Sequence, residues 1–109
     1  MTRDEALKIY DQIVAACPKI ERKGKTMPYT SANGYMFSQL NKTGEIGIRL
    51  SKTEGKAFMQ KYPSSGPFRS YGAVMKDYVL IPEELLTNTD LMASYLEKAH
   101  QYVLTLPPK

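Results

Sequence analysis

The sequence predicts an α+β domain of two layers, in which an antiparallel sheet of about five strands is packed by an N-terminal, a middle and a C-terminal helix. Strict alternation of apolar and polar side chains in residues 44–50 is typical of a half-buried strand. Apolar side chains at three- and four-residue steps near both ends of the chain are typical of amphipathic helices. A chain of 109 residues can bury one hydrophobic core, so residues 1–109 are predicted to form a single domain.

The first helix is expected to begin near Arg3, because Thr2 and Glu5 have the spacing of a capping box. Pro18 is expected to end it, since the residue before a proline is driven out of the helical region. Cys17 then lies at the helix end. No histidine is near it in the sequence, so we expect it to pack in the core rather than to act as a nucleophile.

A short edge strand is predicted to follow, near residues 25–30 and after a run of basic residues. Pro28 lacks a backbone N–H, and a missing donor is tolerated best at the edge of a sheet. The segment 30–34 is predicted as a turn, because Asn33-Gly34 is a favoured pair for left-handed backbone angles.

The stretch 33–50 is predicted to be the central hairpin around which the domain is organised. Its strands, residues 34–40 and 44–50, are joined by a turn at 41–44 that ends in a left-handed glycine. In the first strand, alternation divides the side chains between two faces, with Tyr35 and Phe37 on one and Met36, Ser38 and Leu40 on the other.

The second strand of this hairpin is expected to floor the core. Its apolar side chains, Ile46, Ile48 and Leu50, share one face, on which the first and last helices are expected to rest. The opposite face is expected to be polar and to be the side on which a partner of the sheet would bind. It carries Glu45, Gly47 and Arg49.

The second half of the chain continues with helices and strands. A helix is predicted to start after Ser51, which has Glu54 three residues later, and to end before Pro63. Strands are predicted over residues 68–71 and 74–81, with Gly72 in the turn between them. A brief turn at PEELL then leads to the last helix, for which Thr87 and Asp90 supply the start pattern.

Charge is distributed unevenly along the chain. Residues 19–76 carry eleven Lys or Arg against three acids, a balance of +8, whereas the two flanks together carry −4. A basic middle segment favours an anionic partner, protein or nucleic acid. It is also compatible with a fold whose helices and sheet edge happen to carry opposite charges. The candidate contacts to an anionic partner are Arg22, Lys23, Lys25, Arg49, Arg69 and Lys76.

No residue pattern in the sequence predicts catalysis, and no metal or cofactor is expected. One His and one Cys give no cluster at ligand spacing, and the glycine-rich phosphate motifs and the GxSxG motif are absent. Glu83 and Glu84 fit the start of a helix better than an acid–base pair, because neighbouring residues on a helix do not face each other. His100 could meet Cys17 only through a tertiary contact. The eight tyrosines fit core or strand positions, or an exposed sheet that stacks bases or contacts a protein.

The expected location is the cytoplasm, with no membrane partner. No apolar run approaches the roughly 20 residues of a membrane span, and the N-terminus lacks the apolar core of a signal peptide. A single cysteine agrees with a reducing compartment.

Three segments carry a resemblance to a known family: KGKTMPYTSANGYMF, EIGIRLS and YVLIPEELL. In this order, between an opening and a closing helix, they resemble the N-terminal domain of TfoX/Sxy proteins. The family's Met-Phe-Gly motif reads Met27-Pro28-Tyr29 here, so the chain departs from it at two positions. The resemblance covers nearly the whole chain and implies a two-layer α/β fold akin to secretion-chaperone-like folds. Family members include regulators of competence for DNA uptake, usually with a second, C-terminal domain that we do not expect here, and they offer no catalytic residues.

Three functions remain open from the sequence. The first is a non-enzymatic binding module for a protein or nucleic acid. The second is a small-molecule-binding or enzymatic domain, whose pocket between sheet and helices holds tyrosines and one or two of Arg49, Arg69 and Lys76. The third is self-association through the proline-bearing edge strand, which would make the chain a monomer or a weak homodimer.

Overall fold

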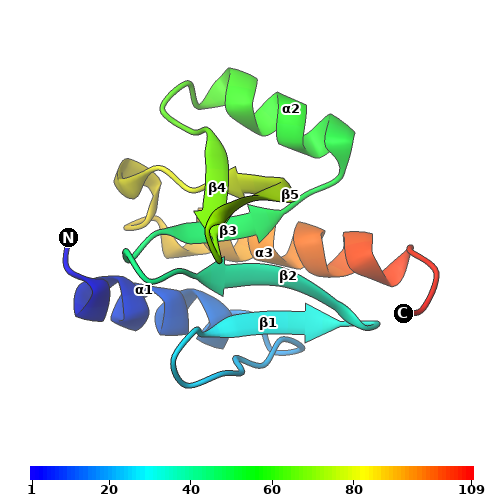
Figure 1. The fold of residues 1–109 in the computed structure, drawn as a ribbon, viewed down its shortest axis with the longest axis horizontal. Helices are drawn as coiled ribbons and strands as arrows, with labels where there is room; N and C mark the ends of the chain where they lie inside the picture. Colours follow the sequence, from blue (N-terminus) through cyan, green and yellow to red (C-terminus); the bar gives the residue numbers. More distant parts are fainter.

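Five antiparallel strands form one sheet in the computed structural model, which describes residues 1–109 (Figure 1). The strand order is β1-β2-β3-β5-β4, and three helices pack against the sheet, so the predicted α+β fold is confirmed. The strands are β1 (Tyr29–Ala32), β2 (Tyr35–Leu40), β3 (Ile46–Arg49), β4 (Pro67–Ser70) and β5 (Ala73–Leu80). The helices are α1 (Arg3–Ala15), α2 (Lys52–Lys61), α3 (Thr89–Leu104) and a 3₁₀ turn, η1 (Glu83–Leu85).

The main core lies between the sheet and the pair α1 and α3, which contact each other and β2. Ile46, Ile48 and Leu50 are buried in this core, as the alternation predicted. Helix α2 lies at the β5 side of the sheet, far from β1 (Figure 1, top and bottom). None of the helices combines the length and apolar character needed to cross a membrane.

The helix starts follow local capping chemistry. Thr2 and Glu5 form the predicted capping box of α1, with hydrogen bonds of 3.2 and 3.1 Å. The predicted start of α3 was one residue early, because the capping side chain is that of Asn88, which accepts a hydrogen bond from the N–H of Leu91.

The edge strand β1 also differs from its prediction, which placed it at residues 25–30. The turn consists only of Asn33 and Gly34, with φ of 57° and 83°, so the residues before it pair with β2. Pro28 lies just before the strand, and the edge position is confirmed. Lys23 pairs with Tyr29 as an isolated bridge on the outer side of β1.

A β-bulge in β2 breaks the predicted alternation. Thr30 pairs with Ser38 and the next residue, Ser31, pairs with Met36, so Phe37 has no partner in β1. Phe37 therefore joins the core, where its ring stacks on His100 at 5.3 Å between centroids. Leu40 is in the same core, although strict alternation would place it on the face opposite Phe37.

The outer face of the sheet is covered by the chain itself, because the β4–β5 hairpin curls over β3. Phe68 is fully buried and lies over Gly47, and the side-chain amide of Asn41 donates to the carbonyl of Arg69 at 2.8 Å. The expected polar docking face of β3 is therefore not open. Gly47 is buried, Arg49 is half-buried, and only Glu45 is exposed.

Candidate functional site

The six basic residues singled out from the sequence do not form one patch. Lys23 and Lys25 lie beside β1, whereas Arg69 and Lys76 lie on β4 and β5, at the opposite edge of the sheet (Figure 1). Lys23 donates to the hydroxyl of Ser31 at 3.0 Å, within its own edge of the fold. The basic middle of the sequence is thus divided between two sides of the molecule.

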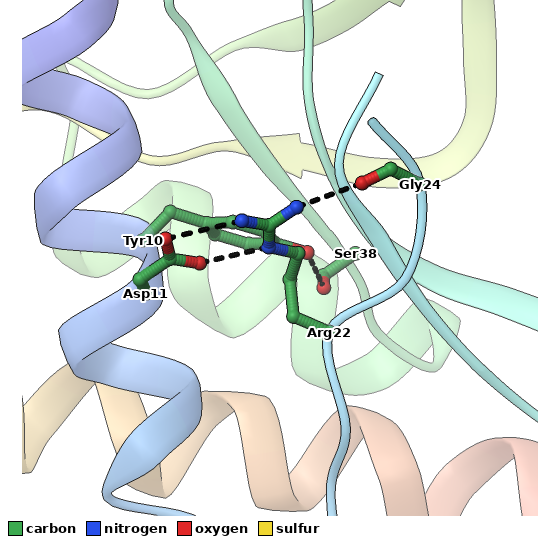
Figure 2. A network of polar contacts seen from close by, with 5 residues as sticks. All are labelled: Tyr10, Asp11, Arg22, Gly24 and Ser38. Carbon is green, nitrogen blue, oxygen red and sulfur yellow. Dashed lines mark hydrogen bonds and ion pairs between the residues drawn. The ribbon is translucent and has the colours of Figure 1, made fainter. Parts of the chain in front are cut away.

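Arg22 has a structural role (Figure 2). Its guanidinium donates to both carboxylate oxygens of Asp11 on α1, at 2.9 and 3.2 Å, and to the carbonyl of Gly24 at 2.7 Å. The hydrogen bonds to Asp11 raise the pKa of Arg22. The same picture shows Tyr10, whose hydroxyl is hydrogen-bonded to that of Ser38 at 2.6 Å. Arg22 joins the basic segment to α1 and is not free for a partner.

Arg49 is also held within the fold. Its guanidinium lies 5.4 Å from the ring centre of Tyr35, 5.9 Å from that of Tyr102 and 3.9 Å from the carboxylate of Asp77. Its buried Nε has no hydrogen-bond partner. The two rings and the carboxylate offset the charge, so Arg49 offers little to an external anion.

A groove between α2 and β5, with a volume of about 520 Å³, has more hydrophobic residues in its lining than any other concavity of the molecule. Leu50 and Val79 line its floor, and Met59 and Val74 are exposed at 41% and 51% along its walls. Lys76 from the predicted set lies on it. Exposed apolar side chains in a concave surface mark a binding site more often than isolated surface leucines do.

The groove lies beside a β-bulge in β5. Arg69 pairs with Val74, and Pro67 pairs with Val79. Between these two pairs, β4 has the single residue Phe68, whereas β5 has residues 75–78. Asp77, inside the bulge, has φ of 67°, a left-handed conformation that aspartate tolerates better than most residues. A bulge re-aims side chains, and here Met75, Lys76 and Asp77 border the groove.

Three lysines give the groove its positive charge: Lys52 and Lys56 on α2, and Lys76 on β5. None of the three makes an ion pair. The one acidic residue on the groove is Asp77, whose carboxylate lies beside Arg49. The groove is therefore apolar inside and positively charged around its rim.

Lys52, Lys56 and Met59 were not singled out from the sequence. Their spacing of four and three residues on a predicted helix placed them on one face, which is the signal that could have found them. Nothing in the sequence indicated that this face of α2 lies next to the bulge of β5, because the position of α2 is determined only in the folded chain.

Cys17 and His100 border a small cavity of about 180 Å³. The thiol of Cys17 is buried and donates to the carbonyls of Ile13 and Ala93 at 3.5 and 3.6 Å. Burial, and then the charge of Glu97, raise the pKa of Cys17 to about 11. The thiolate is thus disfavoured at neutral pH, in agreement with a packing role.

Tyr78, which borders the groove, is likewise unsuited to proton transfer. Burial raises its pKa, and its hydroxyl donates to the carbonyl of Met36 at 2.8 Å. No group of three or more His, Cys, Asp or Glu is placed to hold a metal ion.

A scan against models of known protein families and a search of curated proteins found no match for this chain. The resemblance to TfoX/Sxy N-terminal domains therefore stays a prediction.

Proposed function

We propose that this domain is a non-enzymatic protein-interaction module that docks an acidic segment of a partner protein in the groove between α2 and β5. The observation that carries the proposal is the combination of an apolar lining with three unpaired lysines, Lys52, Lys56 and Lys76. Apolar side chains of a partner would be desolvated in the groove, and its carboxylates would meet the lysines. A regulatory role through protein contacts also agrees with the resemblance to TfoX/Sxy proteins.

A nucleic-acid partner is supported less well. Binding of a phosphate backbone needs several cations along one surface. Here the cations divide between the β1 side and the α2 side, and Arg22 and Arg49 are engaged inside the fold. The only strongly exposed aromatic side chain is Tyr71, at 71%, so a platform for stacking bases is lacking.

Peptide selection tests the proposed function through the sequence preference of the groove. Peptides that bind the domain are selected from a displayed random library, and those that also bind the variant K52E/K56E/K76E are removed. We expect enrichment of peptides that combine acidic and apolar residues, with affinity at least about tenfold weaker for that variant. The matched control K8E/K19E/K25E has the same change in net charge at exposed lysines away from the groove and should bind as the unmodified domain does.

Three outcomes would overturn the proposed function. The first is the absence of any acid-enriched peptide. The second is equal loss of peptide binding in both triple variants, which would indicate a non-specific charge effect. The third is tight binding of labelled DNA or RNA of about 20 nucleotides at low salt, with a steep salt dependence that the K52E/K56E/K76E variant abolishes.

A small amphipathic anion is the second candidate occupant, because a volume of about 520 Å³ lies within the range of small-molecule sites. For this alternative the sequence predicts a pocket that contains tyrosines and basic residues, and the groove contains Tyr78 and Lys76. Titration with a medium-chain carboxylate, followed by the NMR signals of Met59 and Val74, checks it. Saturation at micromolar concentration would favour this candidate over the peptide.

A further inference from the structure

The first half of β5 has an unpaired edge that opens toward the groove. Strand β3 pairs only with the second half of β5, from Tyr78 to Leu80, and the last bond of this ladder runs from the N–H of Leu50 to the carbonyl of Asp77 at 3.1 Å. Ala73 and Val74 pair with β4 on one side, the bulge follows them, and no strand pairs with residues 73–76 on the other side. The neighbour on that open side is the start of α2 across the groove.

Val74 supplies the main-chain donor and acceptor of this edge. Ser70 and Ala73 close a two-residue hairpin turn, in which Tyr71 and Gly72 have φ of 54° and 75°. A closing pair exchanges its hydrogen bonds within the hairpin, so the next residue directs its N–H and C=O away from the partner strand. For Val74, opposite Arg69, that direction is the open side of β5.

The two outer edges of the sheet are partly engaged by comparison. On the outer side of β1, Lys23 exchanges main-chain hydrogen bonds with Tyr29 at 2.8 and 2.9 Å. On the outer side of β4, the carbonyl of Arg69 accepts from Asn41, and Pro67 has no N–H to donate. The first half of β5 is the edge at which free main-chain groups also border the apolar and positively charged groove.

Resting on the proposed function, we propose that the acidic partner segment binds as an added β-strand along residues 73–76 of β5. Val74 and Lys76 stand two residues apart on one face of β5, so on the matching face of the segment an apolar residue lies beside Val74 and an acidic residue lies beside Lys76. The free edge is four residues long, which corresponds to about 13 Å of added strand. The partner motif is thus a short extended segment in which an apolar and an acidic residue stand two positions apart, on one face of the strand.

A second copy of this chain fits the edge poorly. Pairing of one β5 edge with another would bring Lys76 of both copies close together, with Lys52 and Lys56 nearby. Like charges at cross-strand positions destabilise a sheet, and lysine on an exposed edge is a common means of preventing such pairing. The charge that excludes a second copy favours an acidic segment.

The test uses a synthetic peptide of about seven residues, in which valine or leucine takes turns with glutamate at every second position so that both lie on one face, together with singly N-methylated versions of it. N-methylation removes one main-chain donor and leaves the protein unchanged. We expect loss of affinity of about tenfold or more at alternate positions only, since every second N–H of an added strand faces β5. We also expect slower amide hydrogen exchange at Val74 in the complex.

The outcomes separate the binding mode from the proposed function. Suppose that the peptide binds the unmodified domain and that the K52E/K56E/K76E variant does not bind it. If N-methylation at every position then leaves the affinity unchanged and the amide of Val74 gains no protection from exchange, strand addition is wrong and the docking function stands. A gain of helical circular dichroism on binding would lead to the same conclusion. If neither this peptide nor any selected acidic peptide binds, both are overturned. Peptide-induced dimerisation seen by sizing would also contradict a single strand added to one domain.

Discussion

The ring of Phe68 lies directly over Gly47, so close that a Cβ atom on this glycine would come within 2.3 Å of the ring. Phe68 is on β4 and Gly47 is on β3, two strands that are not neighbours in the sheet. Their contact holds the β4–β5 hairpin over the outer face, together with the stacking of Phe68 on Tyr78 at 5.7 Å between centroids.

The variant Gly47→Ala is expected to lower the free energy of unfolding by about 1–3 kcal/mol, because the added methyl group overpacks the site under Phe68. Urea denaturation measures the change. Gly55→Ala is the matched control. Its Cβ would lie 3.8 Å from Val79, an ordinary contact, and replacement of a helical glycine should stabilise the domain by about 1 kcal/mol. Similar effects of the two variants would contradict the close packing of Phe68 on β3.

Two buried serines should respond differently to alanine. The hydroxyl of Ser70 has no hydrogen-bond partner, whereas that of Ser38 is bonded to Tyr10 and Thr30. Ser70→Ala is expected to change the free energy of unfolding by less than about 0.5 kcal/mol or to raise it, while Ser38→Ala should lower it by about 1–3 kcal/mol. Chemical denaturation of both variants checks this, and equal losses would count against the assigned bonding.

The pair of Asp11 and Arg22 should contribute to stability and leave docking unchanged. A double-mutant cycle with Asp11→Asn and Arg22→Gln is expected to give a coupling of about 0.5–1 kcal/mol, because both side chains are partly exposed. The coupling should shrink in high salt. Affinity for the selected acidic peptide should be the same in Arg22→Gln as in the unmodified domain. A large loss would show that Arg22 contacts the partner after all.

Cys17 should make the domain sensitive to alkaline pH. Its pKa is raised from 9.0 to about 11 in the folded state, so the folded chain holds the thiol proton more tightly than the unfolded chain does. The resulting stabilisation is fully present below pH 9 and is lost as the pH rises toward 11. Thermal unfolding at several pH values should show a smaller alkaline loss for Cys17→Ala than for the unmodified domain. The native thiol should also react slowly with iodoacetamide at neutral pH, and rapid labelling would contradict its burial.

Local chemistry was readable from the sequence where it acts within a few residues. The capping box of Thr2 and Glu5 and the left-handed turn at Asn33-Gly34 needed no tertiary information. The apolar alternation from Ile46 to Leu50 also predicted the floor of the core. These features depend on backbone sterics and on the two-residue period of side chains in a strand, and both are determined by residues that are neighbours in the sequence.

The bulges were not readable in the same way. At the bulge of β2, Phe37 stacks on His100 of α3. At the bulge between β4 and β5, the single β4 residue is Phe68, which lies over Gly47 of β3. Both depend on contacts between residues far apart in the sequence. The expectation of an open polar face on β3 was wrong for the same reason, since the covering strand comes about twenty residues later. The lysines of α2 could be placed beside Lys76 only once that bulge was known.

The strand order has a consequence for the kinetics of folding. Three of the four strand pairings join consecutive strands through loops of two to five residues, whereas β3 pairs with β5 across the whole of α2 and β4. Short hairpins form in microseconds. Closing the long loop between β3 and β5 costs more chain entropy before the contacts between these strands can stabilise the chain. We therefore expect the β1–β3 meander and the β4–β5 hairpin to form first, and their joining at Ile48 and Val79 to set the folding rate.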